Sequence, residues 1–347
     1  MKADFIKYVL KFKQPAGTSR GILTTKETYF IKINKNKKIG IGESAIFRGL
    51  SADDVSDYQE KLSWAVKNIN LSKDDLFNNL KNYSSIIFGL EQAFQSLQAE
   101  NPFHLYNNDF TEGHKGIPIN GLVWMGEKKF MFEQIKRKIK QGFKVIKLKI
   151  GAIDFADELY LLKYIRSQFS PEEIEIRVDA NGAFAPDEAF EKIKYLSDYF
   201  IHSIEQPIKA GQFEKMFDLC RKSPIPIALD EELIGYNHLI NKKDFLYKIQ
   251  PQYIILKPAL HGGFIGTKTW IEAAKKLKID WWITSALESN IGLNAIAQFT
   301  YSLNVKIPQG LGTGSLFINN IDSPLFINNG SLFYKKNENW NYSKIFK

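Results

Sequence analysis

The chain has 347 residues, of which 44% are hydrophobic and 24% are charged, and its formal net charge at pH 7 is +9. This length suits a large domain with a smaller partner, and no run of apolar residues is long enough to indicate a membrane span. The lysines alternate with acids and accompany no DNA- or RNA-binding motif, which argues against a nucleic-acid partner. A positive field does suit a small anionic substrate.

The first residues, MKADFIKYVLKFK, alternate apolar and charged side chains. A secretory signal would need an unbroken apolar run, so we expect a strand here and a cytoplasmic protein. The single cysteine, Cys220, excludes an internal disulfide. Nothing in the residues indicates an oligomeric state.

Residues 1–105 contain alternating strand patterns, such as YVLKFK and TYFIKIN, followed by amphipathic helical patterns. This order predicts an N-terminal α+β capping domain. Gly, Pro and Asn at 106–117 predict a linker into a second domain that spans 106–315. Short strand-like pieces in 316–347 predict a C-terminal return that packs on the capping domain.

From residue 118 onward the chain repeats one unit, a short apolar run that ends in a polar residue and is followed by a helical pattern. From Lys149 on, successive strand ends lie 25 to 30 residues apart, which is the length of one strand, one helix and two loops. We therefore predict an α/β fold with a (β/α) TIM-like barrel. A doubly wound sheet is the structural alternative. The eight strand-like runs are 118–126, 144–150, 173–179, 201–205, 225–230, 253–257, 281–285 and 307–312.

Charged residues mark the ends of the predicted strands, where a barrel gathers its chemistry. They are, in chain order, Lys147, Lys149, Asp179, Glu205, Asp230 and Lys257. One such acid is more simply a helix cap or a surface ion-pair partner. Three acids on successive strands need a cation to offset their repulsion, and an all-oxygen set favours Mg²⁺.

Lys147 and Lys149 are two residues apart, so on a strand they face the same side. Two ammonium groups side by side make it easier for one of them to give up its proton and act as a base. Arg177 shares a face with Asp179 and is predicted to support the acids electrostatically. A metal on a substrate carboxylate would stabilise the charge left when the neighbouring carbon loses its proton. We expect such proton abstraction, followed by elimination, racemisation or epimerisation.

Six motifs carry a resemblance to a known family: KLKIG (147–151), RVDANGAF (177–184), SIEQPI (203–208), ALDEEL (228–233), ILKPALHGGF (255–264) and TSALESNIG (284–292). Through them the chain resembles the enolase superfamily, in its muconate-lactonizing subgroup, over nearly its whole length. The resemblance implies Mg²⁺, with Mn²⁺ as an alternative ion, and Lys149 as the base with Lys257 across the site. It also implies Asp179, Glu205 and Asp230 as metal ligands, supported by Asn181 and Glu231.

Within that subgroup, GTSRGILTTKETYF (17–30), GESAIFRGLS (42–51) and GLGTGSLFINNI (310–321) are most similar to the o-succinylbenzoate synthase family. The likeness implies a hydro-lyase that dehydrates 2-succinyl-6-hydroxy-2,4-cyclohexadiene-1-carboxylate, a small dicarboxylate, in menaquinone biosynthesis. Lys149 would remove the proton and return it to the departing hydroxyl, with Lys257 near the ring. The implied substrate contacts are Thr18, Ser19, Arg20, Ser285 and Gly312.

The close alternative is an N-succinylamino-acid racemase or a dipeptide epimerase on the same scaffold, which also uses two opposed lysines. Dipeptide epimerases typically carry an acidic D-x-D-type motif at the eighth strand, where this chain has Gly310, Gly312 and Thr313. A remote alternative is a non-catalytic metal-binding barrel. Such a decayed enzyme usually lacks a ligand or the base, and this chain retains all of them.

Overall fold

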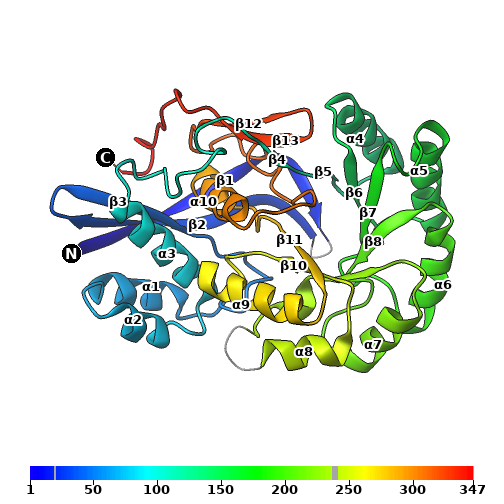
Figure 1. The fold of residues 1–347 in the computed structure, drawn as a ribbon, viewed down its shortest axis with the longest axis horizontal. Helices are drawn as coiled ribbons and strands as arrows, with labels where there is room; N and C mark the ends of the chain where they lie inside the picture. Colours follow the sequence, from blue (N-terminus) through cyan, green and yellow to red (C-terminus); the bar gives the residue numbers. More distant parts are fainter. Residues whose placement is uncertain (19–20, 237–240, 347) are drawn as a thin grey trace.

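The N-terminal alternating segment forms an antiparallel sheet that is separate from the barrel. The structure is a computed structural model that describes residues 1–18, 21–236 and 241–346. In this sheet β2 is central, pairing with β1 on one side and with β3 on the other. Three helices pack beside the sheet (Figure 1). The elements are β1 (Lys2–Thr18), β2 (Gly21–Lys35), β3 (Lys38–Ser44), α1 (Tyr58–Lys67), α2 (Lys73–Asn79) and α3 (Ser84–Gln98).

Alternation along β2 turns one row of apolar side chains toward the helices. Tyr29, Ile31 and Ile33 are buried at every second position and pack in one cluster with α1 and α3. The packing of α3 on β3 depends on glycine, because a Cβ on Gly42 would lie 2.0 Å from the carbonyl oxygen of Gly89. The two backbones approach closely only because both positions lack a side chain.

The repeating units form a parallel sheet in which each strand from β5 to β11 pairs with the next one in chain order. The helices between the strands lie on the outer side of this curved sheet (Figure 1). Among the described residues, no helix has the length and apolar character to cross a membrane. The strands are β5 (Gly121–Val123), β6 (Val145–Lys149), β7 (Glu175–Asp179), β8 (Ile201–Glu205), β9 (Ile227–Leu229), β10 (Tyr253–Leu256) and β11 (Asp280–Ile283), and the helices are α4 (Lys128–Lys140), α5 (Phe155–Gln168), α6 (Pro186–Ser197), α7 (Phe213–Lys222), η1 (Glu231–Leu233), α8 (Lys242–Ile249), α9 (Gly263–Lys276) and α10 (Asn290–Ser302).

The eighth strand differs from its prediction. Residues 307–312 form single bridges in place of a strand: Gln309 pairs with Ile119 on one side, and Gly310 pairs with Thr284 on the other. These bridges still close the ring between β11 and β5. Gly310 permits this close approach, since a Cβ there would lie 2.1 Å from Thr284 Oγ1. The consecutive strand order confirms the predicted barrel and excludes a doubly wound sheet, in which the order reverses.

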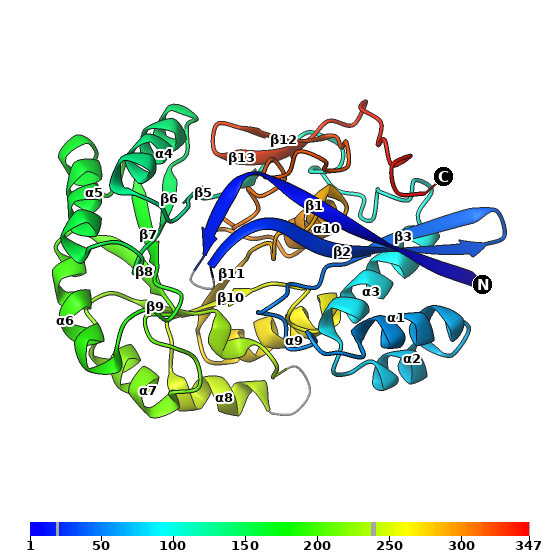
Figure 2. The ribbon, with the colours of Figure 1, turned by 180° about the vertical axis from the view of Figure 1, so that it is seen from behind.

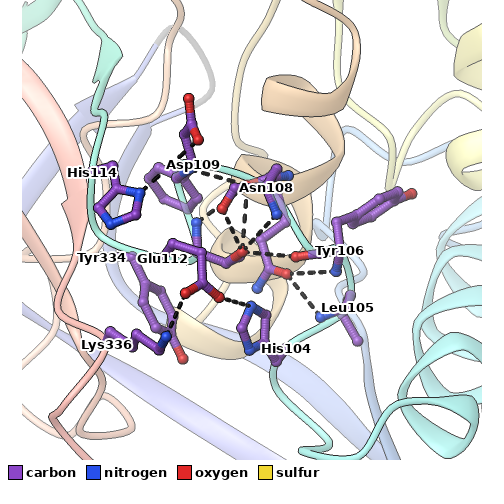
Figure 3. Close-up of polar contacts among 12 residues, drawn as sticks. His104, Leu105, Tyr106, Asn108, Asp109, Glu112, His114, Tyr334 and Lys336 are labelled. Carbon is purple, nitrogen blue, oxygen red and sulfur yellow. Dashed lines mark hydrogen bonds and ion pairs between the residues drawn. The ribbon is translucent and has the colours of Figure 1, made fainter.

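The C-terminal residues return across the molecule. Strand β12 (Leu325–Asn328) pairs with β13 (Ser331–Tyr334), and β13 pairs with β4 (Ile117–Pro118) just before the barrel. Ile321 and Ile345 pack with Phe30 of the antiparallel sheet. The predicted linker is tied down at the same place: Figure 3 shows Glu112 between His104 and Lys336, and Glu112 forms an ion pair with Lys336.

Two features join the antiparallel sheet and its helices to the barrel. The long β1–β2 hairpin extends toward the barrel strands (Figure 2), and its Gly17 bridges Met125 just after β5. Glu91 of α3 accepts hydrogen bonds from the backbone N–H groups of Phe264 and Ile265, the latter at 3.2 Å. These groups begin α9, so a carboxylate of one domain caps a helix of the other.

Candidate active site

Strand register brings the predicted residues together at the carboxyl ends of the strands. Lys149 pairs with Asp179, and Asp179 pairs with Glu205, across β6, β7 and β8. Asp230 follows β9 directly, and Lys257 follows β10. Because parallel neighbours in register point the same way, these side chains converge at one end of the barrel.

Lysines form the ion pairs of the three acids. Lys147 Nζ lies 2.9 Å from Asp179 Oδ2 and also pairs with Glu205 Oε2. Lys149 Nζ lies 2.7 Å from Asp179 Oδ2. Across the site, Lys257 Nζ lies 2.5 Å from Asp230 Oδ2. The acids are buried and the lysines nearly so, which leaves each charge dependent on its neighbours.

Burial and the neighbouring charges shift the pKa values of the three acids in different directions. Burial acts to raise the pKa of Asp179, but the positive charges of Lys147 and Lys149 outweigh it and hold that pKa well below its usual range. Burial and the nearby Asp179 charge raise the pKa of Glu205 well above its ordinary value. At Asp230, burial is outweighed by Lys257 and the pKa is lowered. The surroundings thus favour the ionised form at Asp179 and Asp230 and oppose it at Glu205.

The acids in turn raise the pKa values of two of the lysines. Burial acts to lower the pKa of Lys147, but the charges of Asp179 and Glu205 raise it above its ordinary value. The pKa of Lys257 is raised in the same way, with burial opposed by Asp230. Both lysines therefore stay cationic while they hold the acids.

The donor set suits a hard divalent cation. All three acids supply oxygen, and Asp230 Oδ1 is buried with no hydrogen-bond partner among the described residues, so it has unused acceptor capacity. Among the described residues, no three His, Cys, Asp or Glu side chains lie in the arrangement that a metal ion requires. An ion would have to compete with the lysine ammoniums for the oxygens of Asp179, Glu205 and Asp230.

The two predicted supporting residues Asn181 and Glu231 connect to Lys149. Lys149 Nζ donates to Asn181 Oδ1 at 2.6 Å, and Asn181 Nδ2 donates to Glu231 Oε1 at 2.9 Å. Gln206, which sequence reasoning missed, orders the loop after β9: its Oε1 accepts from the backbone N–H groups of Asp230 and Glu232. A polar residue directly after Glu205 in SIEQPI was the available signal.

Arg177 points into the barrel but lies below the acids. Among the described residues its hydrogen bonds go to Glu175, at 2.7 Å, and to the Pro308 carbonyl, at 2.9 Å. Its guanidinium also lies over the Trp282 ring, 4.5 Å from the centroid. Arg177 therefore fills the interior of the barrel and ties β7 to the segment that closes the ring.

A pocket opens at the carboxyl ends of the barrel strands. It is lined by Lys147, Lys149, Glu205 and Lys257, and by the predicted contacts Ser285 and Gly312. Of the other predicted contacts, Ser19 and Arg20 lie outside the described residues, as does the side chain of Thr18.

Sequence reasoning missed several residues of the pocket wall. Asn120 and Trp124 lie directly before and directly after β5, and Thr313 follows Gly312. Phe47 and Leu50 reach the pocket from the loop after β3, so the antiparallel domain covers one side of it. The apolar residues of that loop, in GESAIFRGLS, were the signal for a contact of this kind.

Comparisons with known proteins agree with this architecture. Residues 131–332 match the family described as enolase C-terminal domain-like. An o-succinylbenzoate synthase from Desulfotalea psychrophila is 44% identical over 96% of this chain and 98% of that protein. The crystal structure of MenC from the same organism superposes with a TM-score of 0.84 at 39% identity, covering 96% of this chain and 99% of that one.

More distant relatives share the fold. An L-Ala-D/L-Glu epimerase from Bacillus subtilis is 21% identical over 87% of this chain and 85% of that protein. Its substrate-liganded structure superposes with a TM-score of 0.81 at 18% identity, covering 96% of this chain and 97% of that one. The family match covers more than half of the chain, and the Desulfotalea psychrophila protein is similar over nearly all of it. The chain belongs to the enolase superfamily and, within it, to the o-succinylbenzoate synthase family.

Proposed function

We propose that the protein is an o-succinylbenzoate synthase, a hydro-lyase that converts 2-succinyl-6-hydroxy-2,4-cyclohexadiene-1-carboxylate into 2-succinylbenzoate for menaquinone biosynthesis. One observation carries the proposal. Lys149 on β6 and Lys257 after β10 line the same pocket, with three strands and the buried acids between them. The specific substrate is proposed from the 44% identical relative, whose name is o-succinylbenzoate synthase.

We also propose that Asp179, Glu205 and Asp230 hold one Mg²⁺. When bound, the ion would supply positive charge beside a substrate carboxylate, which favours loss of the proton on the neighbouring carbon. Their three oxygen-donating side chains and the unpartnered Asp230 Oδ1 support this assignment. Two solved dipeptide epimerases, at 17% and 20% identity, hold Mg and a dipeptide. At that identity they share only the fold with this chain.

The remaining steps belong to the chain's own lysines. Lys149 acts as the base and takes the proton from the ring carbon that bears the carboxylate, and the electron pair of that C–H bond enters the ring as the C–O bond to the hydroxyl breaks. Lys149 then gives the same proton to the departing hydroxyl, so that water leaves and the ring becomes aromatic. Asn181 orients Lys149 through a 2.6 Å hydrogen bond. Lys257 stays cationic on Asp230 and contributes positive charge on the other side of the pocket.

The test is turnover by purified protein with Mg²⁺, followed by loss of the diene absorbance and by mass spectrometry of the product. Lys149→Ala and Asp230→Asn should lower kcat by at least ~1,000-fold, because they remove the base and a metal ligand. Lys163→Ala is the matched control, since Lys163 is an exposed lysine of α5 and should keep wild-type kcat. Chelation by EDTA should abolish turnover, and Mg²⁺ or Mn²⁺ should restore it. Wild-type protein that leaves the diene unchanged in the presence of Mg²⁺ would refute the proposal.

The second candidate, a racemase or dipeptide epimerase, is favoured by the same pair of opposed lysines. Against an epimerase, the segment that closes the ring carries Gly310, Gly312 and Thr313 rather than acids that would hold a substrate amine. Incubation in deuterium oxide with L-Ala-L-Glu and with N-succinyl amino acids separates the candidates. Deuterium exchange at the α-carbon together with inactivity toward the diene would favour the second candidate.

A further inference from the structure

A buried histidine contacts the backbone of Lys257. His261 belongs to the short turn that leads from β10 to α9, and its side chain is fully buried. Its Nδ1 lies 2.9 Å from the backbone nitrogen of Lys257. The steps proposed above do not use this ring, although it touches the residue that supplies positive charge across the pocket from Lys149.

Two hydrogen bonds join the same pair of residues. The Lys257 N–H donates to His261 Nδ1 at 2.9 Å, and the His261 backbone N–H donates to the Lys257 carbonyl oxygen at 3.1 Å. Because β10 ends at Leu256, Lys257 lies just beyond the strand, and a side-chain nitrogen serves as the acceptor for its N–H. The acceptor is buried, so water could not readily replace it if the imidazole were removed.

This network fixes which nitrogen of His261 carries the proton. The Lys257 N–H is a permanent donor, so the Nδ1 atom that faces it has to accept. Nδ1 also lies 3.0 Å from the Lys257 carbonyl oxygen, but that oxygen already accepts from the N–H groups of Leu260 and His261, at 2.8 and 3.1 Å. The proton of the neutral ring is therefore assigned to Nε2. Burial lowers the pKa of His261 to about 3, which keeps the ring neutral and Nδ1 available as an acceptor.

The surroundings of the ring fix its orientation. Trp270 of α9 is fully buried and packs against His261 at an interplanar angle of 77°, with ring centroids 6.4 Å apart. On the other ring nitrogen, Nε2 makes no hydrogen bond with any residue that the structure describes. The polar contacts of this side chain therefore go to Lys257 alone.

We propose that His261 is a positioning residue that holds the backbone of Lys257, so that the Lys257 ammonium group stays in place beside Asp230 at the pocket. The inference rests on the proposed function, in which that group contributes positive charge. Lys257 lines the pocket and its Nζ lies 2.5 Å from Asp230 Oδ2. The position of Nζ depends on where the main chain starts the side chain, and a displacement of about 1 Å near the reacting atoms can lower a rate by about 100-fold.

The test compares three substitutions of His261 in the turnover assay. The Oδ1 atom in His261→Asn is as many bonds from Cβ as Nδ1 and retains the acceptor, whereas His261→Gln moves the acceptor one bond further and His261→Leu removes it. His261→Gln and His261→Leu should lower kcat at least ~10-fold, with KM changed by less than about threefold. His261→Asn should keep kcat within about threefold of wild type.

His202→Leu is the matched control, because it removes another partly buried imidazole from the barrel. His202 lies near the amino end of β8, whose carboxyl end carries Glu205, and its change should leave kcat within about twofold. All three His261 variants lose contacts of the buried ring and should unfold at a lower temperature than wild type. A merely structural role would therefore lower activity in all three, without rescue by His261→Asn. Equal losses in the three variants, or His261→Gln and His261→Leu values within twofold of wild type, would overturn the inference.

Two measurements without substrate separate this inference from the proposed function. In nitrogen-15 NMR of histidine-labelled protein, the His261 signals, identified by their loss in His261→Asn, should show a bare Nδ1 and a protonated Nε2. Deuterium exchange of the Lys257 amide should be faster in His261→Gln and His261→Leu than in wild type and His261→Asn. A protonated Nδ1, or equal exchange in all four proteins, would overturn the inference even if wild type is active. A wild type that shows both expected results but leaves the diene unchanged would refute the proposed function and confirm that His261 holds Lys257.

Discussion

The pH dependence of stability at Glu91 measures the free energy needed to ionise a buried acid at the junction of the two domains. Its carboxylate caps α9 from α3, and burial, opposed by the N–H groups of Phe264 and Ile265, raises its pKa from 4.5 to about 7. At about 1.4 kcal/mol per pKa unit, this difference corresponds to ~3 kcal/mol between the two protonation states. Because the pKa is raised on folding, this stabilisation is fully present below pH 4.5 and is lost as the pH rises through about 7.

Glu91→Gln removes the titration and retains one oxygen as an acceptor for the cap. Below pH 4.5 the variant should be close to wild type in stability, because the neutral carboxylic acid of wild type, like the amide, offers one carbonyl oxygen to the cap. At pH 8 the difference should shift in favour of the variant by ~3 kcal/mol, because wild type must ionise a buried carboxyl.

The assay is urea unfolding followed by circular dichroism from pH 4 to pH 8, with Glu60→Gln as the matched control. Glu60 is an exposed glutamate of α1, so this control repeats the change of charge without the burial. A Glu91→Gln difference that does not change with pH, or that changes equally in the control, would refute the reasoning.

Other predictions concern the antiparallel domain and the site. Ser72→Ala should cost about 1 kcal/mol of unfolding free energy in urea, because Ser72 caps α2 by accepting from the Asp75 N–H. Gly42→Ala should cost at least about 3 kcal/mol, or prevent folding, because its Cβ would meet the Gly89 carbonyl at 2.0 Å; native yield and thermal unfolding measure this. Asn181→Ala should lower kcat by about 10-fold to 100-fold with a smaller change in KM, because it releases the orienting hydrogen bond of Lys149; steady-state kinetics separates the two.

The barrel and its acids could be predicted because both depend on local periodicity. An apolar run with a polar last residue fixes which end of a strand carries chemistry, and parallel register then brings Asp179 and Glu205 side by side. The family resemblance implied Lys257 across the site from Lys149, and both lysines line the pocket. It was less informative at 307–312, where a glycine-rich segment closes the ring through single bridges.

Contacts that depend on side-chain direction or on distant residues were beyond this reasoning. Arg177 shares a face with Asp179 but starts about 6.6 Å lower on the strand, where Glu175 and Trp282 lie nearer. Glu43 and Ser289 are 246 residues apart in sequence, and no local pattern pairs them. The ion pairs between the lysines and the acids also could not be read from spacing, because they depend on which rotamers fill the pocket.

The return of the C-terminal residues to the N-terminal strand has a consequence for synthesis on the ribosome. The backbone carbonyl oxygen of Asn319 accepts a hydrogen bond from the Tyr8 hydroxyl, and Asn319 Oδ1 accepts one from the Lys11 N–H. Lys11 and Asn319 are 308 residues apart in sequence. The strand that carries Lys11 is therefore synthesised long before the partners of its edge, which follow 308 residues later. A nascent chain arrested before residue 319 should therefore expose that edge to proteases and chaperones, and emergence of Asn319 and its neighbours should protect it.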